Sequence, residues 1–523
     1  MVSTGLAGPG GAWDGAIMNL NECLVPRGAR DPVTHVLQPD PVRWPHGLAS
    51  LADYFHSKGL RAGIYTDVAA VTCAGYEGSG PSSADPEGHW PLDALTFAQW
   101  GFDLVEADFC NIDNGEPDLS LYTRARDAIA AATAATGRVI ELYVCSWGDN
   151  ATWGWAPEVA NLQRNTGDIC SPGSIAWEDI LSNFGNTVVN SGTPPRLPGL
   201  PGTGAGAWND PDMLGTGMPG ISDVEGRSQF SLWCLLGAPL FLSADIRNMT
   251  AATFATVSNR EAIAISQQAS RQGVRVFSPS GPAPAPPEGA PFAFTNVSYT
   301  RDFGTSFAFG NAAAGGSLQL LSAVTNLVPT GLCATTPACA AAPGTPVYMA
   351  PCASASAACA SWAMNASNGS VVFAGASCLE ALDPVTQPAA QIVLGECTAG
   401  AASQTWSFQD YSGRLSLAPG TFGERHPAFG ALAPQDIDMF MKELDNGDVA
   451  LAILNRSRDA AGPQTVDLTR LGFAPAQRVQ VRDVWAAATT VATGTFITRA
   501  IESHETLLLR LASVASSASM AEL

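Results

Sequence analysis

The chain has 523 residues, of which 46% are hydrophobic, and its 47 acidic and 26 basic residues give a formal net charge of −21. This length favours roughly two to four domains. The negative charge opposes binding to phosphate backbones and anionic lipid, and no apolar run approaches the roughly 20 residues that cross a bilayer, so we expect neither nucleic acid nor membrane as a partner.

The first half of the chain alternates β-rich runs with helical stretches. Seven strands are predicted, at Gly15–Asn21, Leu60–Asp67, Phe102–Asp108, Val139–Ser146, Asn165–Ile169, Ala207–Met213 and Pro239–Asp245. Helices are predicted between them, at Gly47–Lys58, Leu92–Trp100, Leu119–Thr136 and Glu225–Leu236. The alternation predicts an α/β fold, a (β/α)8 TIM barrel over residues 1–270 with its active site at the carboxyl ends of the strands. Because closure needs an eighth strand, we expect either a further strand within the chain or an incomplete N-terminus.

The second half of the chain is predicted to be all-β. Residues 271–314 contain the Pro- and Gly-rich stretch Ser278–Ala290 and begin a C-terminal β-domain. Residues 431–512 complete that domain, since apolar positions alternate over Gly447–Leu511 as in an antiparallel β-sandwich. Residues 513–523 are rich in Ala and Ser and are expected to form a disordered tail.

An internal repeat lies within residues 315–430. Both copies read Cys, about nineteen residues, Cys, about nine residues, Trp; the first has Cys333, Cys352 and Trp362, and the second has Cys378, Cys397 and Trp406. The repeat resembles the units of ricin-type β-trefoil lectins. The expected disulfides are Cys333–Cys352 and Cys378–Cys397, with Cys339–Cys359 as a further pair. The segment is either a glycan-binding unit or a disulfide-stabilised insert that binds no glycan.

Two aspartates at predicted strand ends are candidates for catalysis. Asp108 ends the segment Phe102–Asp108, and Asp168 lies in Asn165–Ile169. Glycoside hydrolysis needs two carboxyl groups that face each other across the glycosidic bond, and a barrel displays such groups at the ends of different strands. In a chain with 47 acidic residues most strand-end aspartates cap helices or face solvent, so the pattern alone leaves their role open.

Several blocks of sequence resemble the family of α-galactosidases and α-N-acetylgalactosaminidases, the melibiases, in order and spacing over about 250 residues. The blocks are Gly59–Val68, Thr72–Tyr76, Asp93–Asp103, Trp208–Leu214 and Ser231–Trp233 with Ala238–Leu240. The resemblance implies a retaining glycoside hydrolase that removes terminal α-linked galactose from oligosaccharides, glycolipids or polysaccharides. It further implies that Asp108 is the nucleophile and Asp168 the general acid/base of a double displacement.

The same resemblance implies which residues bind the substrate. They are Asn21, Glu22, Tyr65, Cys73, Glu106, Cys145, Trp147 and Arg164. Cys73 and Cys110 match a disulfide of the family beside the site, with two buried free thiols as the alternative. No cofactor is expected, and because the six His form no ligand-spaced cluster, no metal is expected either.

Three features depart from the family. Asn21 and Glu22 stand where the family has two Asp that hold the 4- and 6-hydroxyl groups of the sugar, and Glu106 stands where it has a Lys. The first barrel strand is not found in the sequence, which leaves Cys23 without its usual partner. We therefore keep two alternatives: a glycosidase for a changed glycon, such as a β-L-arabinopyranosidase or α-N-acetylgalactosaminidase, and a catalytically weakened carbohydrate-binding protein.

The cysteines and glycosylation sequons favour an extracellular or vacuolar/lysosomal protein that passes through the secretory pathway. There are twelve Cys, and Asn-x-Ser/Thr sequons begin at Asn150, Asn248, Asn296, Asn365, Asn368 and Asn455. No signal peptide is visible in the first residues, so we expect it upstream of Met1. The sequence does not predict the oligomeric state.

Overall fold

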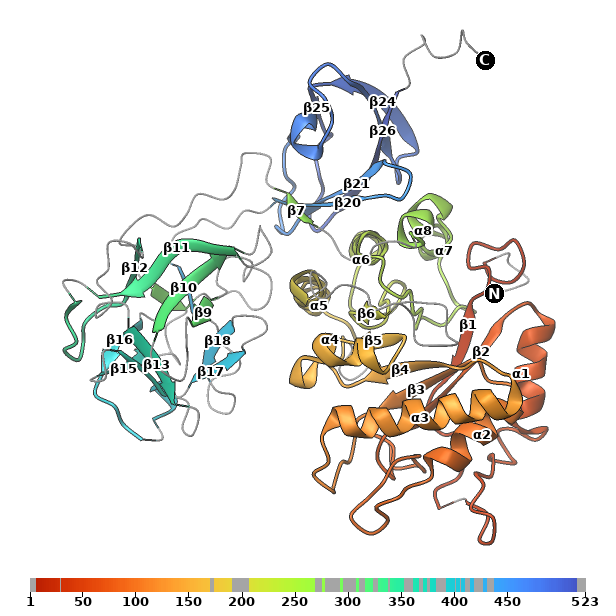
Figure 1. Cartoon of the computed structure of the whole chain (residues 1–523). Coiled ribbons are helices and arrows are strands. Elements are labelled where there is room, and N and C mark those ends of the chain that lie inside the picture. The colour runs from red at the N-terminus through yellow and green to blue at the C-terminus, as the bar shows by residue number, and fades with distance from the viewer. Residues whose placement is uncertain are drawn as a thin grey trace. The chain divides into compact units, whose positions relative to one another are not determined.

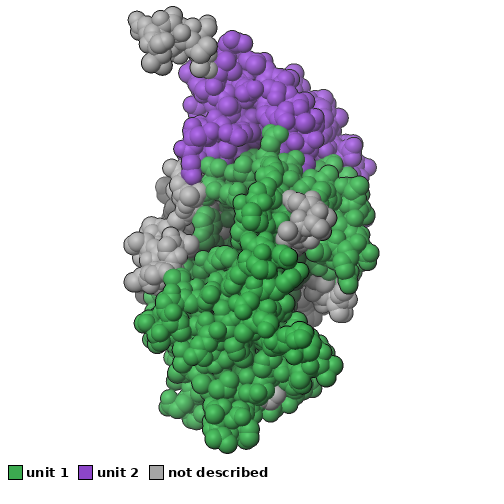
Figure 2. Space-filling view, turned by 90° about the vertical axis from the view of Figure 1, so that its right-hand side faces the viewer, with its two compact units in different colours: residues 1–175, 193–273 green, residues 176–192, 274–523 purple. Residues whose placement is uncertain are grey.

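The computed structural model shows a parallel α/β unit and a set of antiparallel sheets (Figure 1). It describes residues 6–28, 30–169, 174–190, 207–268, 275–277, 292–294, 307–309, 316–322, 328–336, 339–351, 361–365, 370–373, 377–381, 392–399, 401–404, 406–409, 414–417, 427–429 and 437–514. The chain divides into two compact units, residues 1–175 with 193–273 and residues 176–192 with 274–523 (Figure 2). No helix in the described ranges is both long and apolar enough to span a bilayer.

A parallel sheet of six strands in sequence order forms the centre of the first unit. The strands are β1 (Ile17–Leu20), β2 (Arg61–Asp67), β3 (Leu104–Asp108), β4 (Glu141–Cys145), β5 (Leu162–Arg164) and β6 (Trp208–Asp210). The helices are α1 (Gly47–Ser57), α2 (Trp90–Trp100), α3 (Asp118–Thr136), α4 (Thr152–Trp155), α6 (Asp223–Leu236), α7 (Ala251–Val257) and α8 (Arg260–Ser266). This strand–helix alternation confirms the α/β prediction.

Apolar side chains of the strands and helices form one continuous core in this unit. Ile64, Val105 and Val144 lie in it beside Phe97 of α2 and Tyr122 of α3. Burial of this apolar surface holds the helices against the sheet. Because the six strands are parallel, their carboxyl ends lie at the same edge of the sheet, and polar residues cluster there.

Two of the predicted strands differ from the structure. The segment Asn165–Ile169 is a loop, because the strand is β5, which lies between β4 and β6 and ends at Arg164. The Arg164 side chain donates to the Thr166 carbonyl oxygen and so holds the first residues of this loop. The segment Pro239–Asp245 contributes an isolated bridge, Leu214 to Leu242, to the described residues rather than a strand.

The second unit contains an antiparallel sheet with the strand order β22-β25-β24-β23-β26-β21-β20-β7. Its strands are β7 (Arg275–Phe277), β20 (Ile437–Glu443), β21 (Val449–Asn455), β22 (Thr465–Asp467), β23 (Arg478–Asp483), β24 (Ala488–Thr493), β25 (Thr495–Ile497) and β26 (Thr506–Ser513). Helix α5 (Trp177–Asn190) packs on it, with Trp177 stacked on His504 and Phe184 against Phe440. Strand β26 includes Ser513, one residue of the predicted tail, and residues 515–523 lie outside the described part.

The repeat region of the second unit is made of short antiparallel strands. They are β8 (Phe292–Phe294), β9 (Phe307–Phe309), β10 (Gly316–Ser322), β11 (Val328–Thr335), β12 (Tyr348–Pro351), β13 (Ser361–Asn365), β14 (Ser370–Phe373), β15 (Ser377–Ala381), β16 (Ile392–Gly395), β17 (Trp406–Gln409), β18 (Arg414–Leu417) and β19 (Pro427–Phe429). Cys378 and Cys397 form the predicted disulfide. Cys352 and Cys359, the partners in the other two predicted pairs, lie outside the described residues. Trp362 is buried against Phe373, so the repeated Trp of the first copy belongs to the core.

Candidate active site

A cavity of about 700 Å³ opens at the carboxyl ends of the barrel strands. Parallel strands bring the residues at their carboxyl ends to this edge, which is where barrels carry their active sites. All ten residues predicted from the sequence to catalyse or to bind the substrate line this one cavity. They are Asn21, Glu22, Tyr65, Cys73, Glu106, Asp108, Cys145, Trp147, Arg164 and Asp168.

Asp108 is held by hydrogen-bond donors at the end of β3. The Tyr65 hydroxyl donates to Oδ2 at 2.8 Å, the Phe109 amide donates to Oδ1 at 3.0 Å, and the buried Cys145 thiol donates as well. Burial raises the pKa of Asp108, while these donors and the Arg164 charge oppose the rise. The carboxylate is thus fixed in orientation and its negative charge is stabilised, as a nucleophile requires.

Arg164 links two acidic residues. Its Nη2 lies 3.0 Å from Asp168 Oδ1, and its Nη1 lies 3.0 Å from Asp212 Oδ1. Asp212 is buried and also accepts a hydrogen bond from the Ile169 amide, whereas the Asp168 side chain is 68% exposed. Asp168 is therefore the member of this cluster that is free to exchange a proton with substrate and water.

Glu106 shares the inner face of β3 with Asp108, since residues two apart on a strand point to the same side. Burial and the neighbouring Asp108 charge raise the pKa of Glu106 to about 8. Asn19 of β1 donates from Nδ2 to Glu106 Oε2 at 2.5 Å. Asn19 reaches Glu106 across Gly63 of β2, where an added Cβ would lie 2.4 Å from Asn19 Oδ1.

Glu22 is bound to the loop that follows β2. Its two carboxylate oxygens accept from Thr72 Oγ1 and from the Ala74 amide, each at 2.9 Å. The neighbouring Asn21 side chain accepts from the Glu22 amide at 2.8 Å. These contacts hold the Glu22 side chain, which is one methylene longer than Asp, against the cavity wall. Each of its carboxylate oxygens already accepts one hydrogen bond from the loop.

Trp147 follows β4 in a backbone conformation that L-residues rarely adopt. Its φ is 56°, and Gly148 follows with a φ of 92°. A Cβ on Gly148 would lie 2.6 Å from the Asn165 carbonyl oxygen, so only glycine fits there. The turn places the Trp147 ring at the cavity wall, edge-on to Phe109, and such strained residues concentrate at functional sites.

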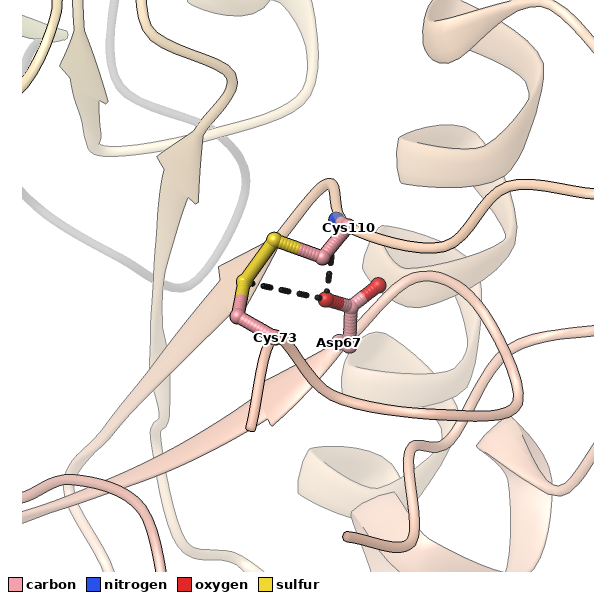
Figure 3. A group of neighbouring side chains, drawn as sticks. All are labelled: Asp67, Cys73 and Cys110. Carbon is pink, nitrogen blue, oxygen red and sulfur yellow. Dashed lines mark hydrogen bonds between the residues drawn. A yellow bond between two sulfur atoms is a disulfide. The ribbon is translucent and has the colours of Figure 1, made fainter. Parts of the chain in front are cut away.

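Cys73 and Cys110 form a disulfide beside the cavity, as the family resemblance implied (Figure 3). The Cys73 sulfur lies 3.2 Å from Asp108 Oδ2. The buried Asp67 carboxylate points toward the disulfide and accepts from the Cys110 amide at 3.0 Å. One carboxylate oxygen and two sulfur atoms approach within 4.8 Å here, but the disulfide removes the thiolates that a metal would need.

Sequence reasoning did not predict several residues that line the cavity. They include Asn19, Tyr143, Asp212, Met213, Phe241, Leu242 and Ser243. The two-residue period of a strand was a usable signal for two of them, because Asn19 precedes Asn21 and Tyr143 precedes Cys145 by two positions. Asp212 lies in one of the blocks that resemble the family, but its place in the cavity becomes evident only from its ion pair with Arg164.

Three family models match parts of the chain. Residues 12–268 match the family model described as alpha galactosidase A. That part of the chain belongs to the α-galactosidase A (melibiase) family. Outside this melibiase domain, residues 434–511 match the alpha galactosidase C-terminal beta sandwich domain, and residues 322–418 match the ricin-type beta-trefoil lectin domain. The predicted fold class, TIM barrel followed by β-sandwich with a trefoil insert, is confirmed.

Relatives of the melibiase domain carry two activities in their names. An alpha-galactosidase A from Cellvibrio japonicus is 38% identical over 273 residues, 51% of this chain and 61% of the relative. An alpha-N-acetylgalactosaminidase from Rattus norvegicus is 39% identical over 259 residues, 48% of this chain and 56% of the relative. The chain thus spans between about half and three fifths of the length of the curated relatives it matches.

Solved structures share the fold at lower identity. The crystal structure of alpha-galactosidase I from Mortierella vinacea superposes with a TM-score of 0.58 and 18% identity, over 99% of this chain and 91% of that chain. At this identity the likeness concerns the fold alone.

The buried carboxyl groups of the melibiase domain predict how stability depends on pH. Burial raises the pKa of Asp67 to about 8 and that of Asp210 to about 7. Burial together with the Asp108 charge raises the pKa of Glu106 to about 8. In the unfolded chain such groups titrate near pH ~4. The folded state therefore binds more protons between about pH 4 and 8, and its stability falls across that interval as pH rises.

We expect the thermal unfolding midpoint of the barrel to decrease from about pH 5 to about pH 8. Exposed carboxyl groups whose pKa is lowered, such as Asp31 and Asp245, titrate below this interval and do not offset the trend. Calorimetry in buffers of equal ionic strength measures the effect. Replacing Glu106 with Gln should flatten the slope, and a midpoint that rises toward pH 8 would contradict the pKa assignments.

Proposed function

We propose that the chain is a retaining glycoside hydrolase that removes terminal α-linked galactose, with Asp108 as nucleophile and Asp168 as general acid/base. The observation that carries this proposal is the unequal setting of two carboxyl groups in one cavity. Asp108 is buried and bound by three donors, whereas Asp168 is largely exposed beside Arg164. Two carboxyl groups in different environments are what a nucleophile and a proton donor require.

The proposed reaction has two displacements. Asp108 attacks the anomeric carbon while the protonated Asp168 gives its proton to the leaving oxygen, so the glycosidic bond breaks and a glycosyl ester forms on Asp108. Asp168 then takes a proton from water, the water oxygen attacks the anomeric carbon, and Asp108 is released as a carboxylate. Two inversions give net retention. Retaining enzymes hold the two carboxyl groups roughly 5–5.5 Å apart when substrate is bound.

The second candidate concerns the glycon and is motivated by Glu22. Its carboxylate is tied to Thr72 and Ala74 at the cavity wall, in the place where the family holds the 4- and 6-hydroxyl groups. A pyranose that lacks the 6-hydroxymethyl group would leave more room beside the longer side chain. A β-L-arabinopyranoside is therefore the competing substrate that this geometry favours.

Hydrolysis of matched aryl glycosides separates the candidates. The p-nitrophenyl glycosides of α-D-galactopyranose, α-N-acetylgalactosamine and β-L-arabinopyranose should be compared by kcat/KM, and the first is expected to be hydrolysed fastest. A preference for the arabinoside would support the changed glycon. No hydrolysis of any of the three would reject both enzyme proposals and leave a carbohydrate-binding role. Proton NMR of the first product formed should show the retained anomer.

We infer a second glycan site in the repeat region, supported by the match to the ricin-type lectin domain and by the Cys378–Cys397 disulfide. Passage through the secretory pathway is supported by the disulfides of both units, since such bonds form and persist in oxidising compartments.

A further inference from the structure

Glu106 places a second carboxyl group next to the proposed nucleophile, and the proposed reaction gives it no role. It lines the cavity, is 8% exposed, and lies two residues before Asp108 on the same face of β3. Two neighbouring carboxylates in a buried site repel each other, and this favours the protonated form of one of them. The first question is therefore which of the two groups holds the proton.

The hydrogen bonds assign the proton to Glu106. Asp108 accepts from Tyr65, Phe109 and Cys145, and each donor favours its ionised form. Within the described part of the chain, the Glu106 carboxyl group accepts from Asn19 alone. The Arg164 charge favours the ionised form of both carboxyl groups, so it does not decide between them.

The other elements packed around Glu106 reinforce this assignment. The groups that face it are Tyr65 of β2, Asp108 of β3, Tyr143 and Cys145 of β4, Arg164 of β5 and Asp210 of β6. Burial keeps Tyr65, Tyr143 and Cys145 neutral, since it raises the pKa of each. Arg164 is thus the one cation among these neighbours.

Asn19 occupies one oxygen of the Glu106 carboxyl group. Its Nδ2 donates to Oε2, and Oε1 has no hydrogen-bond partner among the residues that the structure describes, so a proton on Oε1 is the one that can reach the sugar. We propose that Glu106 is a specificity-determining residue that acts as a neutral acid and donates a hydrogen bond from Oε1 to a hydroxyl oxygen of the bound sugar, beside the charged Asp108. The inference rests on the proposed function, because the sugar is the ligand of the same cavity.

This role has a consequence for pH. When Glu106 ionises it becomes an acceptor and adds a negative charge next to Asp108, so the sugar loses a donor. Burial and the Asp108 charge put that pKa at about 8. Binding of a neutral sugar should therefore weaken as pH rises through this value, by about tenfold if one such hydrogen bond is lost.

Calorimetric titration with D-galactose from about pH 6 to pH 9 tests the proposal without relying on turnover. The dissociation constant of the unaltered protein should rise by about tenfold across this range. Glu106→Gln keeps a neutral donor of similar shape and should remove the pH dependence. Asn19→Ala removes a donor that stabilises the ionised form, so its transition should move to higher pH. Asp113→Asn is the control, because it removes an exposed carboxylate outside the cavity and should leave both the affinity and the transition where they are.

An equal transition in the Glu106→Gln variant would overturn the proposal and assign the pH dependence to another group, such as Asp67 or Asp210. Infrared difference spectra keep the test independent of sugar binding. The unaltered protein minus Glu106→Gln should show a protonated carboxyl band at about pH 6.5 that is lost by about pH 9. Absence of this band rejects the neutral acid, whereas the band without any galactose binding or aryl glycoside hydrolysis rejects the proposed function.

Discussion

Asp108→Asn is expected to lower kcat on p-nitrophenyl α-D-galactopyranoside by about four orders of magnitude or more, since an amide does not form the glycosyl ester. Asn has nearly the shape of Asp and can still meet the Tyr65 hydroxyl and the Phe109 amide, which bind the carboxylate at 2.8 and 3.0 Å. The fold and the cavity should therefore persist. Steady-state rates measure the loss, and an unchanged thermal unfolding midpoint controls for misfolding.

Azide rescue shows whether Asp108 is the nucleophile rather than a residue that supports one. In Asp108→Gly the side chain is gone, and azide can attack the anomeric carbon from the vacated side while the phenolate leaves. The product should be the β-galactosyl azide, with inverted configuration, formed at a rate that rises with azide concentration. Formation of the α-azide would indicate that another group still forms the glycosyl ester and would contradict the assignment.

The family resemblance implied the residues of the site, and the two-residue period of a strand explains why two of them lie together. Asp108 and Glu106 share a face because a strand repeats every two residues, and β3 ends at Asp108 as predicted. Once the strands are known to be parallel, it follows that the carboxyl ends of β1 to β5 lie together at the cavity. This is why residues from different strands, among them Tyr65, Cys145 and Arg164, line one cavity, although Arg164 lies outside the strand predicted at Asn165–Ile169.

The parts that the sequence did not predict depend on contacts between distant segments. Asn19 reaches Glu106 only because Gly63, 44 positions further along the chain, has no side chain there. The end of β5 at Arg164 is set by pairing with β4 and β6, which a local pattern does not reveal. Likewise, Asp212 becomes part of the site through its ion pair with Arg164. Long-range pairing outweighs local propensity in such places.

Asp168 lies in the loop after β5 rather than at a strand end, and its proposed role predicts a dependence on the leaving group. Asp168→Ala should lower kcat/KM on an alkyl α-galactoside such as melibiose by about 10²–10⁴-fold, since the leaving oxygen then departs without a proton. On 2,4-dinitrophenyl α-galactoside the same variant should lose far less, because that phenolate leaves without protonation. Comparing kcat/KM for the two substrates measures the difference.

Asp212→Asn is the matched control for this prediction. Asp212 contacts the same Arg164 guanidinium as Asp168, at the same 3.0 Å, but it is buried and accepts from the Ile169 amide. Its replacement should disturb Arg164 and slow both substrates by a similar factor. A leaving-group dependence in Asp212→Asn but not in Asp168→Ala would transfer the acid/base role to Asp212. The opposite pattern would assign proton transfer to Asp168, because Asp212 also contacts Arg164 but is buried.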